Sequence, residues 1–97
     1  MTDPTSESLL TNRYRLMELI GRGAMGQVYR AEDVLLGGVI VAVKFLAQTL
    51  LTPRMRDRFR SEARTSALLS TKSMHIVRVM DYGVNDEGVP FYVMEYL

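Results

Sequence analysis

The stretch that decides the fold is Ile20-Gly21-Arg22-Gly23-Ala24-Met25-Gly26-Gln27-Val28, followed by Val41-Ala42-Val43-Lys44. Glycine has no Cβ, so the three glycines let the backbone turn tightly and bring bare N–H groups against a phosphate. The lysine, 18 residues after the last glycine, supplies a positive point charge for the same phosphates. Together the two segments predict a phosphate clamp and, after it, a strand that carries one lysine.

The pattern GxGxxG also occurs in dinucleotide-binding folds, which need a helix opening at the glycines and an acidic residue about 20 positions further on. Here the stretch from Gln27 to Glu32 alternates polar and apolar side chains with period two, which indicates a strand. Nothing acidic lies near position 46. The sequence therefore argues against a dinucleotide site.

The combination of GxGxxGxV on a hairpin with VAVK on the next strand resembles the motifs of the eukaryotic-like protein kinases. The residues within these motifs look like those of the bacterial (Hanks-type) Ser/Thr group. The resemblance covers about Tyr14 to Leu97, nearly the whole chain. It implies an α+β fold, the kinase small lobe, with a five-stranded antiparallel sheet and one main helix in the order β-β-β-α-β-β. It also implies ATP as the ligand.

Local signals place these elements along the chain. Residues 1–12 are rich in Ser, Thr, Asp and Pro, which predicts a disordered lead-in before a lobe over residues 13–97. Thr52-Pro53 predicts the start of a helix that runs to about residue 69 or 70, because a hydroxyl caps a helix and proline suits its first position. Strands are expected over 14–20, 27–34, 39–46, 76–82 and 89–95, with turns at 35–38 and 85–88.

The resemblance gives two side chains a catalytic role. Lys44 would reach the α- and β-phosphates of ATP, and Glu62 on the predicted helix would pair with Lys44 and hold it there. The simpler interpretations are a lysine that extends into water and a solvated carboxylate bonded to Arg58 or Ser66. The spacing of the two residues favours the functional interpretation.

The resemblance also implies the nucleotide contacts. Val28 and Ala42 would touch the adenine ring, Met94 would form the back wall of the adenine pocket, and backbone groups of Glu95 and Leu97 would contact the adenine edge. An apolar core strand explains Met94 equally well. The residues expected to bind ATP are Ile20, Gly21, Arg22, Gly23, Ala24, Met25, Gly26, Gln27, Val28, Ala42, Lys44, Met94, Glu95 and Leu97.

Three other features are interpreted as structural. Asp81-Tyr82-Gly83 looks like the magnesium-binding Asp-Phe-Gly motif of kinases, but no His-Arg-Asp loop precedes it, so we assign it to a turn. The single histidine, His75, would lie between the helix and the fourth strand and is expected to be structural. The arginines from Arg54 to Arg60 predict a solvated helix face rather than a docking surface.

Composition excludes several classes of partner. The net charge of +1 gives no reason to expect nucleic acid or a membrane surface, and the absence of cysteine excludes disulfides and thiolate metal sites. The longest apolar run, residues 39–43, is too short to cross a bilayer, and residues 1–8 lack the features of a signal peptide. We therefore expect a cytoplasmic segment.

Phosphoryl transfer also needs magnesium ligands and a residue that orients the attacking hydroxyl, and kinases supply both from their large lobe. The sequence stops at the expected hinge, so we expect a truncated lobe without metal ligands. The Mg²⁺ ion would be held by the missing lobe, and this lobe alone would be inactive. Apolar groups left without that lobe also predict marginal stability or self-association.

Three functions stay open at this point. The leading hypothesis is the ATP-binding lobe of a protein Ser/Thr kinase, which in the complete enzyme transfers the γ-phosphate of ATP to hydroxyls of a protein substrate. The second is a non-catalytic regulatory or interaction module that docks on an intact kinase. The third is the small lobe of an ATP-dependent small-molecule phosphotransferase with a different large lobe.

Overall fold

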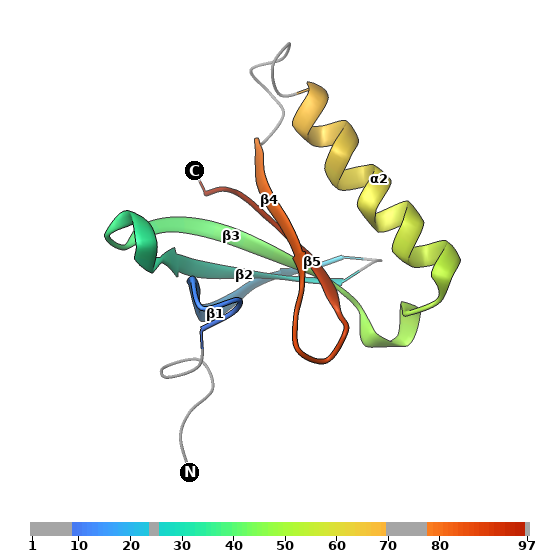
Figure 1. The fold of residues 1–97 in the computed structure, drawn as a ribbon, viewed down its shortest axis with the longest axis horizontal. Coiled ribbons are helices and arrows are strands. Elements are labelled where there is room, and N and C mark those ends of the chain that lie inside the picture. Colours follow the sequence, from blue (N-terminus) through green and yellow to red (C-terminus); the bar gives the residue numbers. More distant parts are fainter. Residues whose placement is uncertain (1–8, 24–25, 70–77, 97) are drawn as a thin grey trace.

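One antiparallel sheet and one long helix form the chain (Figure 1). A computed structural model describes residues 9–23, 26–69 and 78–96. The strands are β1 (Tyr14–Arg22), β2 (Gly26–Asp33), β3 (Val39–Leu46), β4 (Val79–Val84) and β5 (Pro90–Glu95). The long helix is α2 (Pro53–Leu69), and two short 3₁₀ helices are η1 (Val34–Leu36) and η2 (Gln48–Leu50). The predicted α+β class and the predicted order of strands and helix are confirmed.

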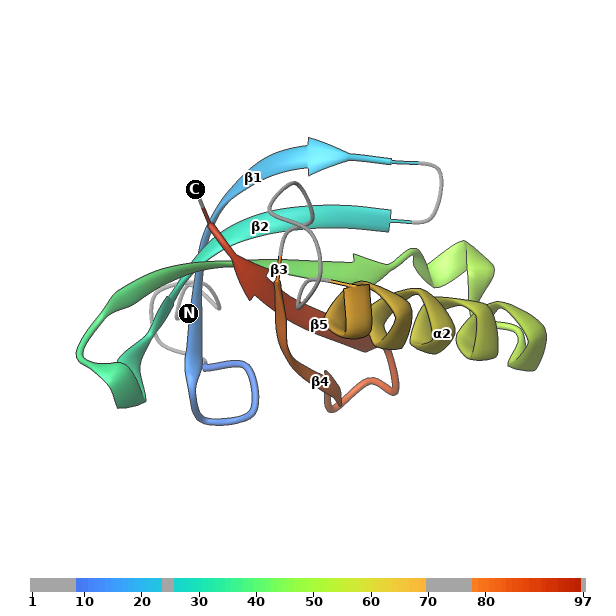
Figure 2. The ribbon, with the colours of Figure 1, turned by 90° about the horizontal axis from the view of Figure 1, so that it is seen from above.

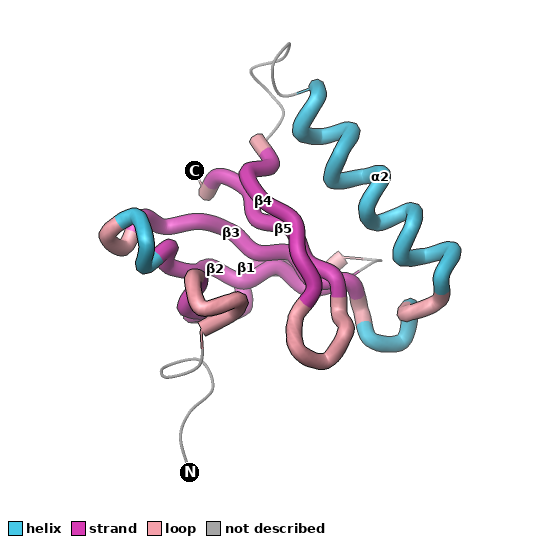
Figure 3. The backbone as a smooth tube through the Cα atoms, in the orientation of Figure 1, coloured by secondary structure: helices cyan, strands magenta, loops and turns pink. Residues whose placement is uncertain are grey.

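The strands lie in the order β1-β2-β3-β5-β4, so β3 is the central strand (Figure 3). Side chains alternate between the two faces of a strand, which puts Val41 and Val43 on one face and Ala42 and Lys44 on the other. Val41, Ala42 and Val43 are all buried. Strand β3 is therefore covered on both faces over these residues, as its apolar sequence predicts.

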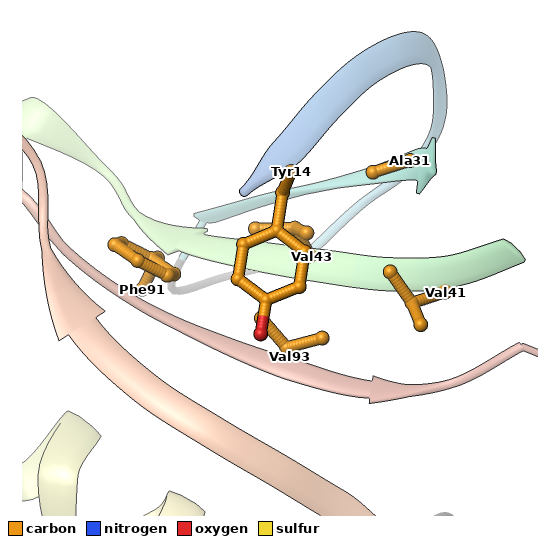
Figure 4. Close-up of a cluster of buried hydrophobic side chains, with 6 residues drawn as sticks. All are labelled: Tyr14, Ala31, Val41, Val43, Phe91 and Val93. Carbon is orange, nitrogen blue, oxygen red and sulfur yellow. The ribbon is translucent and has the colours of Figure 1, made fainter. Parts of the chain in front are cut away.

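Each face of the sheet has its own core. The outer cluster, on the face away from α2, contains Tyr14, Ala31, Val41, Val43, Phe91 and Val93 (Figure 4). The helix cluster, between the sheet and α2, contains Leu46, Phe59, Ala63 and Tyr92. Helix α2 lies beside β4 and β5 (Figures 1 and 2). The helix thus covers the β4–β5 side of this face and reaches β3 at Leu46.

Helix α2 begins as its sequence predicts. The Thr52 hydroxyl accepts a hydrogen bond from the Met55 N–H at 3.2 Å, and Pro53 takes the first helical position. Phe59 and Ala63 lie four residues apart on one side of the helix and are both buried. Their burial against Tyr92 fixes the orientation of α2 relative to the sheet.

The turns contain the expected glycines. Gly37 and Gly38 have φ angles of 75° and 93°, which favour glycine, but the predicted turn at 35–38 is partly wrong because residues 34–36 form η1. The Asp33 side chain caps η1 by accepting the Leu35 N–H. The hairpin turn at 85–88 is confirmed, with the Asn85 side chain accepting the N–H groups of Glu87 and Val89.

Two local predictions differ from the structure. Residues 9–12, which we expected in a disordered lead-in, form a turn in which the Leu10 N–H donates to the Tyr14 carbonyl at 2.8 Å. Leu10 also packs against the outer cluster, a tertiary contact that composition does not report.

The second difference concerns Asp81-Tyr82-Gly83, which lies inside β4 and not in a turn. A Cβ on Gly83 would lie 2.8 Å from the Phe91 ring, so glycine at this position makes room for an aromatic side chain of the next strand. His75 and the predicted start of the fourth strand at 76–77 lie outside the described residues. Within the described ranges, no helix is long and apolar enough to cross a membrane.

Candidate functional site

The two residues expected to act together are in contact. Lys44 comes from β3 and Glu62 from the middle of α2, and Lys44 Nζ lies 2.9 Å from Glu62 Oε1. Their side chains are 21% and 35% exposed, so the ion pair is open to solvent on one side. The interpretation of Glu62 as a carboxylate bonded only to its own helix therefore does not hold.

A third side chain joins this pair. Tyr92 on β5 donates its hydroxyl proton to the same Glu62 oxygen at 2.7 Å. Lys44 and Tyr92 are register partners in the β3–β5 ladder, and Lys44 Nζ lies 5.8 Å from the centre of the Tyr92 ring. Sequence reasoning assigned this part of β5 to the core and missed the contact, because strand register is not readable from the sequence. Glu62 thus accepts hydrogen bonds from two different strands.

These contacts shift the ionisation of both acidic groups. Burial opposes the charge on Glu62, but the hydrogen bonds from Tyr92 and Lys44 outweigh it, and the pKa of Glu62 falls below its ordinary value. Burial, together with the hydrogen bond to the carboxylate, raises the pKa of Tyr92 above its ordinary value. At neutral pH the site therefore holds a charged carboxylate and a protonated phenol.

Apolar side chains extend the same face of the sheet beside this pair. Val28 is the register partner of Lys44, and Met94 is the register partner of Ala42. Since Ala42 and Lys44 point the same way from β3, all four residues share the face on which α2 packs. Ala42 is only 4% exposed, and Val28 and Met94 are half-buried. A positive charge thus lies beside an apolar surface.

The three glycines of the loop differ in their surroundings. Among the described atoms, a Cβ on Gly21 or Gly23 would meet nothing within 4 Å, so both positions face open space. A Cβ on Gly26 would lie 1.7 Å from the Phe45 carbonyl oxygen, so this glycine is required by the close approach of β2 to β3. The Gly23 N–H donates to the Gly26 carbonyl at 2.8 Å and closes the loop. Our expectation that all three serve the phosphates thus misses the packing role of Gly26.

The structure places the remaining predicted contacts as follows. Ile20 and Arg22 are exposed on β1. Gln27 lies on the opposite face from Lys44, where its side chain accepts a hydrogen bond from Tyr29. The N–H and the carboxylate of Glu95 both pair with the backbone of Arg78. Ala24, Met25 and Leu97 lie outside the described residues.

A cavity of about 520 Å³ lies away from this site. It is lined by side chains of the outer face and of the loops beside it, among them Leu16, Tyr29 and Phe45, and not by Lys44 or Glu62. Its polar lining is neutral: Gln27, Gln48, Thr49 and Asn85. The helix-side face, which contains the charged Lys44, therefore suits an anionic ligand better than this cavity does. In the part of the chain that is described, no three potential metal ligands come together.

Comparison with curated proteins finds serine/threonine-protein kinases that are similar to this chain. No protein-family model matches the chain. It is 67% identical over 95 residues to "Serine/threonine-protein kinase A" of Synechocystis, covering 98% of this chain and 18% of that protein. It is 45% identical over 89 residues to PknA of Mycobacterium tuberculosis, covering 88% of this chain and 20% of the relative. It is 44% identical over 91 residues to the probable kinase PknB of Corynebacterium glutamicum, covering 90% and 14%. The chain thus spans a fifth or less of the length of these relatives.

Proposed function

We propose that this chain, which is similar to the N-terminal part of bacterial serine/threonine protein kinases and folds like the small lobe of a kinase, binds ATP on its helix-side face. The observation that carries the proposal is the ion pair of Lys44 and Glu62 beside the apolar residues Val28, Ala42 and Met94. ATP has the complementary layout, because its adenine ring is flat and apolar on its faces while its phosphates are anionic.

Each residue has a defined task in this proposal. Lys44 donates to the α- and β-phosphates, and Glu62 orients the Lys44 ammonium and offsets part of its charge when no nucleotide is bound. Val28 and Ala42 contact the adenine ring, and Met94 limits the depth of its pocket. Gly21 and Gly23 leave the loop backbone uncovered, so that N–H groups can approach the phosphates.

In a longer polypeptide with a large lobe, we propose that the γ-phosphate passes to a Ser or Thr hydroxyl of a protein substrate. Mg²⁺ would neutralise charge on the phosphates, and its ligands would come from that lobe. The contribution of this chain is to bind and orient the nucleotide, since Lys44 can stabilise charge on the α- and β-phosphates.

Calorimetric titration of the chain with Mg-ATP tests the proposal. We expect saturable binding by the wild type and an affinity lowered about tenfold or more by Lys44→Met, which keeps an unbranched side chain of nearly the same length and removes its charge. Arg54→Met is the matched control, because Arg54 is an exposed cation in the first turn of α2, and it should bind as the wild type does. Equal affinities for all three proteins would overturn the assignment of Lys44.

A further inference from the structure

Glu62 has more than one cation within reach. Arg58 precedes it by one helical turn, at the spacing at which side chains of opposite charge attract each other along a helix. With 35% of its side chain exposed, Glu62 is also accessible to water and screening ions. A solvent-exposed Lys–Glu pair is by itself a weak constraint, since two flexible side chains must be ordered to form it. Something else has to favour the conformation in which Glu62 points to the sheet.

Packing holds Tyr92 in a position from which its hydroxyl can keep Glu62 pointed toward the sheet. It is 4% exposed, and the centre of its ring lies 5.0 Å from that of Phe59, which precedes Glu62 by three residues on α2. Ala63, the residue after Glu62, belongs to the same cluster. Apolar packing against the helix next to Glu62 thus places the ring, and its hydroxyl lies 2.7 Å from Oε1.

The tyrosine hydroxyl differs from the ammonium as a partner for Glu62. A buried phenol has two side-chain torsions, both set here by packing, so the hydrogen bond costs little ordering. Lys44 has a long flexible side chain that must also serve the nucleotide. Because both groups donate to Oε1, Glu62 can keep one partner while Lys44 moves toward a phosphate.

We propose that Tyr92 is a positioning residue, whose hydroxyl holds Glu62 toward Lys44 and keeps the ion pair assembled before any nucleotide binds. The proposal deepens the proposed ATP site and rests on it for its functional meaning. The contact itself is a property of the unliganded chain, so its role can be tested without nucleotide. Deletion of the hydroxyl frees Glu62 to turn toward Arg58 or water.

The test is Tyr92→Phe in the complete 97-residue chain, with Tyr82→Phe as the matched control. Tyr82 is the register partner of Tyr92 on β4 and packs near Phe59, but within the described residues its hydroxyl makes no hydrogen bond to Glu62. The first readout is the pKa of the Glu62 carboxyl, which carbon-detected NMR measures. We expect this pKa to rise in Tyr92→Phe and to stay at the wild-type value in Tyr82→Phe, since only the first loses a bond to the carboxylate.

The second readout is affinity for Mg-ATP, which we expect to fall about three- to tenfold in Tyr92→Phe. If the wild type binds no ATP, the proposed function fails, but the pKa of Glu62 still decides the role of Tyr92. An unchanged Glu62 pKa in Tyr92→Phe would overturn the positioning role.

Should Tyr92→Phe fold poorly, exchange of the Tyr92 hydroxyl proton with water decides the question without a substitution at Tyr92. We expect slow exchange in the wild type and fast exchange in Glu62→Ala, because the proton then loses its acceptor. A wild-type proton that exchanges as fast as that of Tyr82 would equally overturn the proposal.

Discussion

Tyr14 and Asp81 lie on the two opposite edge strands of the sheet, and the Tyr14 hydroxyl donates a hydrogen bond to Asp81 Oδ2 at 2.7 Å. The Tyr14 ring spans the distance by lying across Val43 and Val93 on the outer face (Figure 4). The other Asp81 oxygen accepts the Tyr82 N–H at 2.8 Å. This contact links the two edge strands, β1 and β4, across the outer cluster.

We expect Tyr14→Phe to lower the free energy of unfolding by about 1–2 kcal/mol, because Asp81 loses a donor while the ring remains in the core. In a lobe of this size that corresponds to a fall in the thermal midpoint of about 4–8 °C per kcal/mol. Affinity for ATP should stay the same, since the contact lies on the other face of the sheet.

The control for this prediction is Tyr29→Phe. The Tyr29 hydroxyl donates to Gln27 at 3.1 Å, a neutral contact between two half-buried side chains, and its loss should cost clearly less. If the two variants unfolded at the same temperature, the Tyr14–Asp81 hydrogen bond would stabilise the fold no more than the Tyr29–Gln27 hydrogen bond does.

The loop glycines give a second prediction, because alanine should act differently at each. We expect Gly26→Ala to cost about 1–3 kcal/mol of stability, since its Cβ would meet the Phe45 carbonyl at 1.7 Å and β2 would have to shift. Gly21→Ala should leave stability within about 0.5 kcal/mol of the wild type and weaken ATP binding, because the methyl group enters space that the phosphates would use.

Urea unfolding and Mg-ATP titration of both variants check this separation. Gly21→Ala with normal ATP affinity would show that the open space at this glycine is not used by the nucleotide. Gly26→Ala with wild-type stability would contradict the close approach of β2 and β3.

A third prediction concerns acid. Hydrogen bonds from the Arg13 side chain lower the pKa of the buried Asp33 below its ordinary value of 3.8, against the opposing effect of burial, and the pKa of Glu62 likewise lies below its ordinary 4.5. Folding therefore favours the ionised form of both groups. Their stabilisation is fully present above the ordinary values and is lost as the pH falls through the lower values of the folded protein.

We thus expect the free energy of unfolding to be flat near neutral pH and to fall below about pH 4.5, and Asp33→Asn to reduce this dependence at the acid end. Urea unfolding between about pH 2.5 and 7 measures it. The same acid slope in Asp33→Asn as in the wild type would show that the Arg13–Asp33 pair is not its source.

Local sequence signals predicted most of the fold. The alternation in residues 27–32, the apolar stretch at 39–46 and the Thr52-Pro53 start each depend on neighbours in the chain, and β2, β3 and α2 lie where they predict. The resemblance of the motifs to those of kinases predicted the partnership of Lys44 and Glu62, whose side chains meet in the structure.

Contacts that depend on register or on distant packing were not predictable in this way. The hydroxyl groups of Tyr14 and Tyr92 find their acceptors only when the whole sheet is assembled and β5 pairs with β3 in one register. In the sequence, Gly26 looks like a loop glycine and Gly83 like part of a motif. In the structure, a side chain on Gly26 would clash with a carbonyl of β3, and one on Gly83 would clash with a ring of β5. The 3₁₀ helix η2 has no side-chain cap and no local signature.

The central claim is that nucleotide binds on the helix-side face, and amide chemical shifts of the chain during titration with Mg-ATP test it most directly. We predict saturable shifts at Gly21, Val28, Ala42 and Lys44, which surround the proposed site, and small shifts at Val41 and Phe91 in the outer cluster. Shifts confined to the outer face, near the cavity beside Tyr29, or no saturable shifts at all would contradict the account.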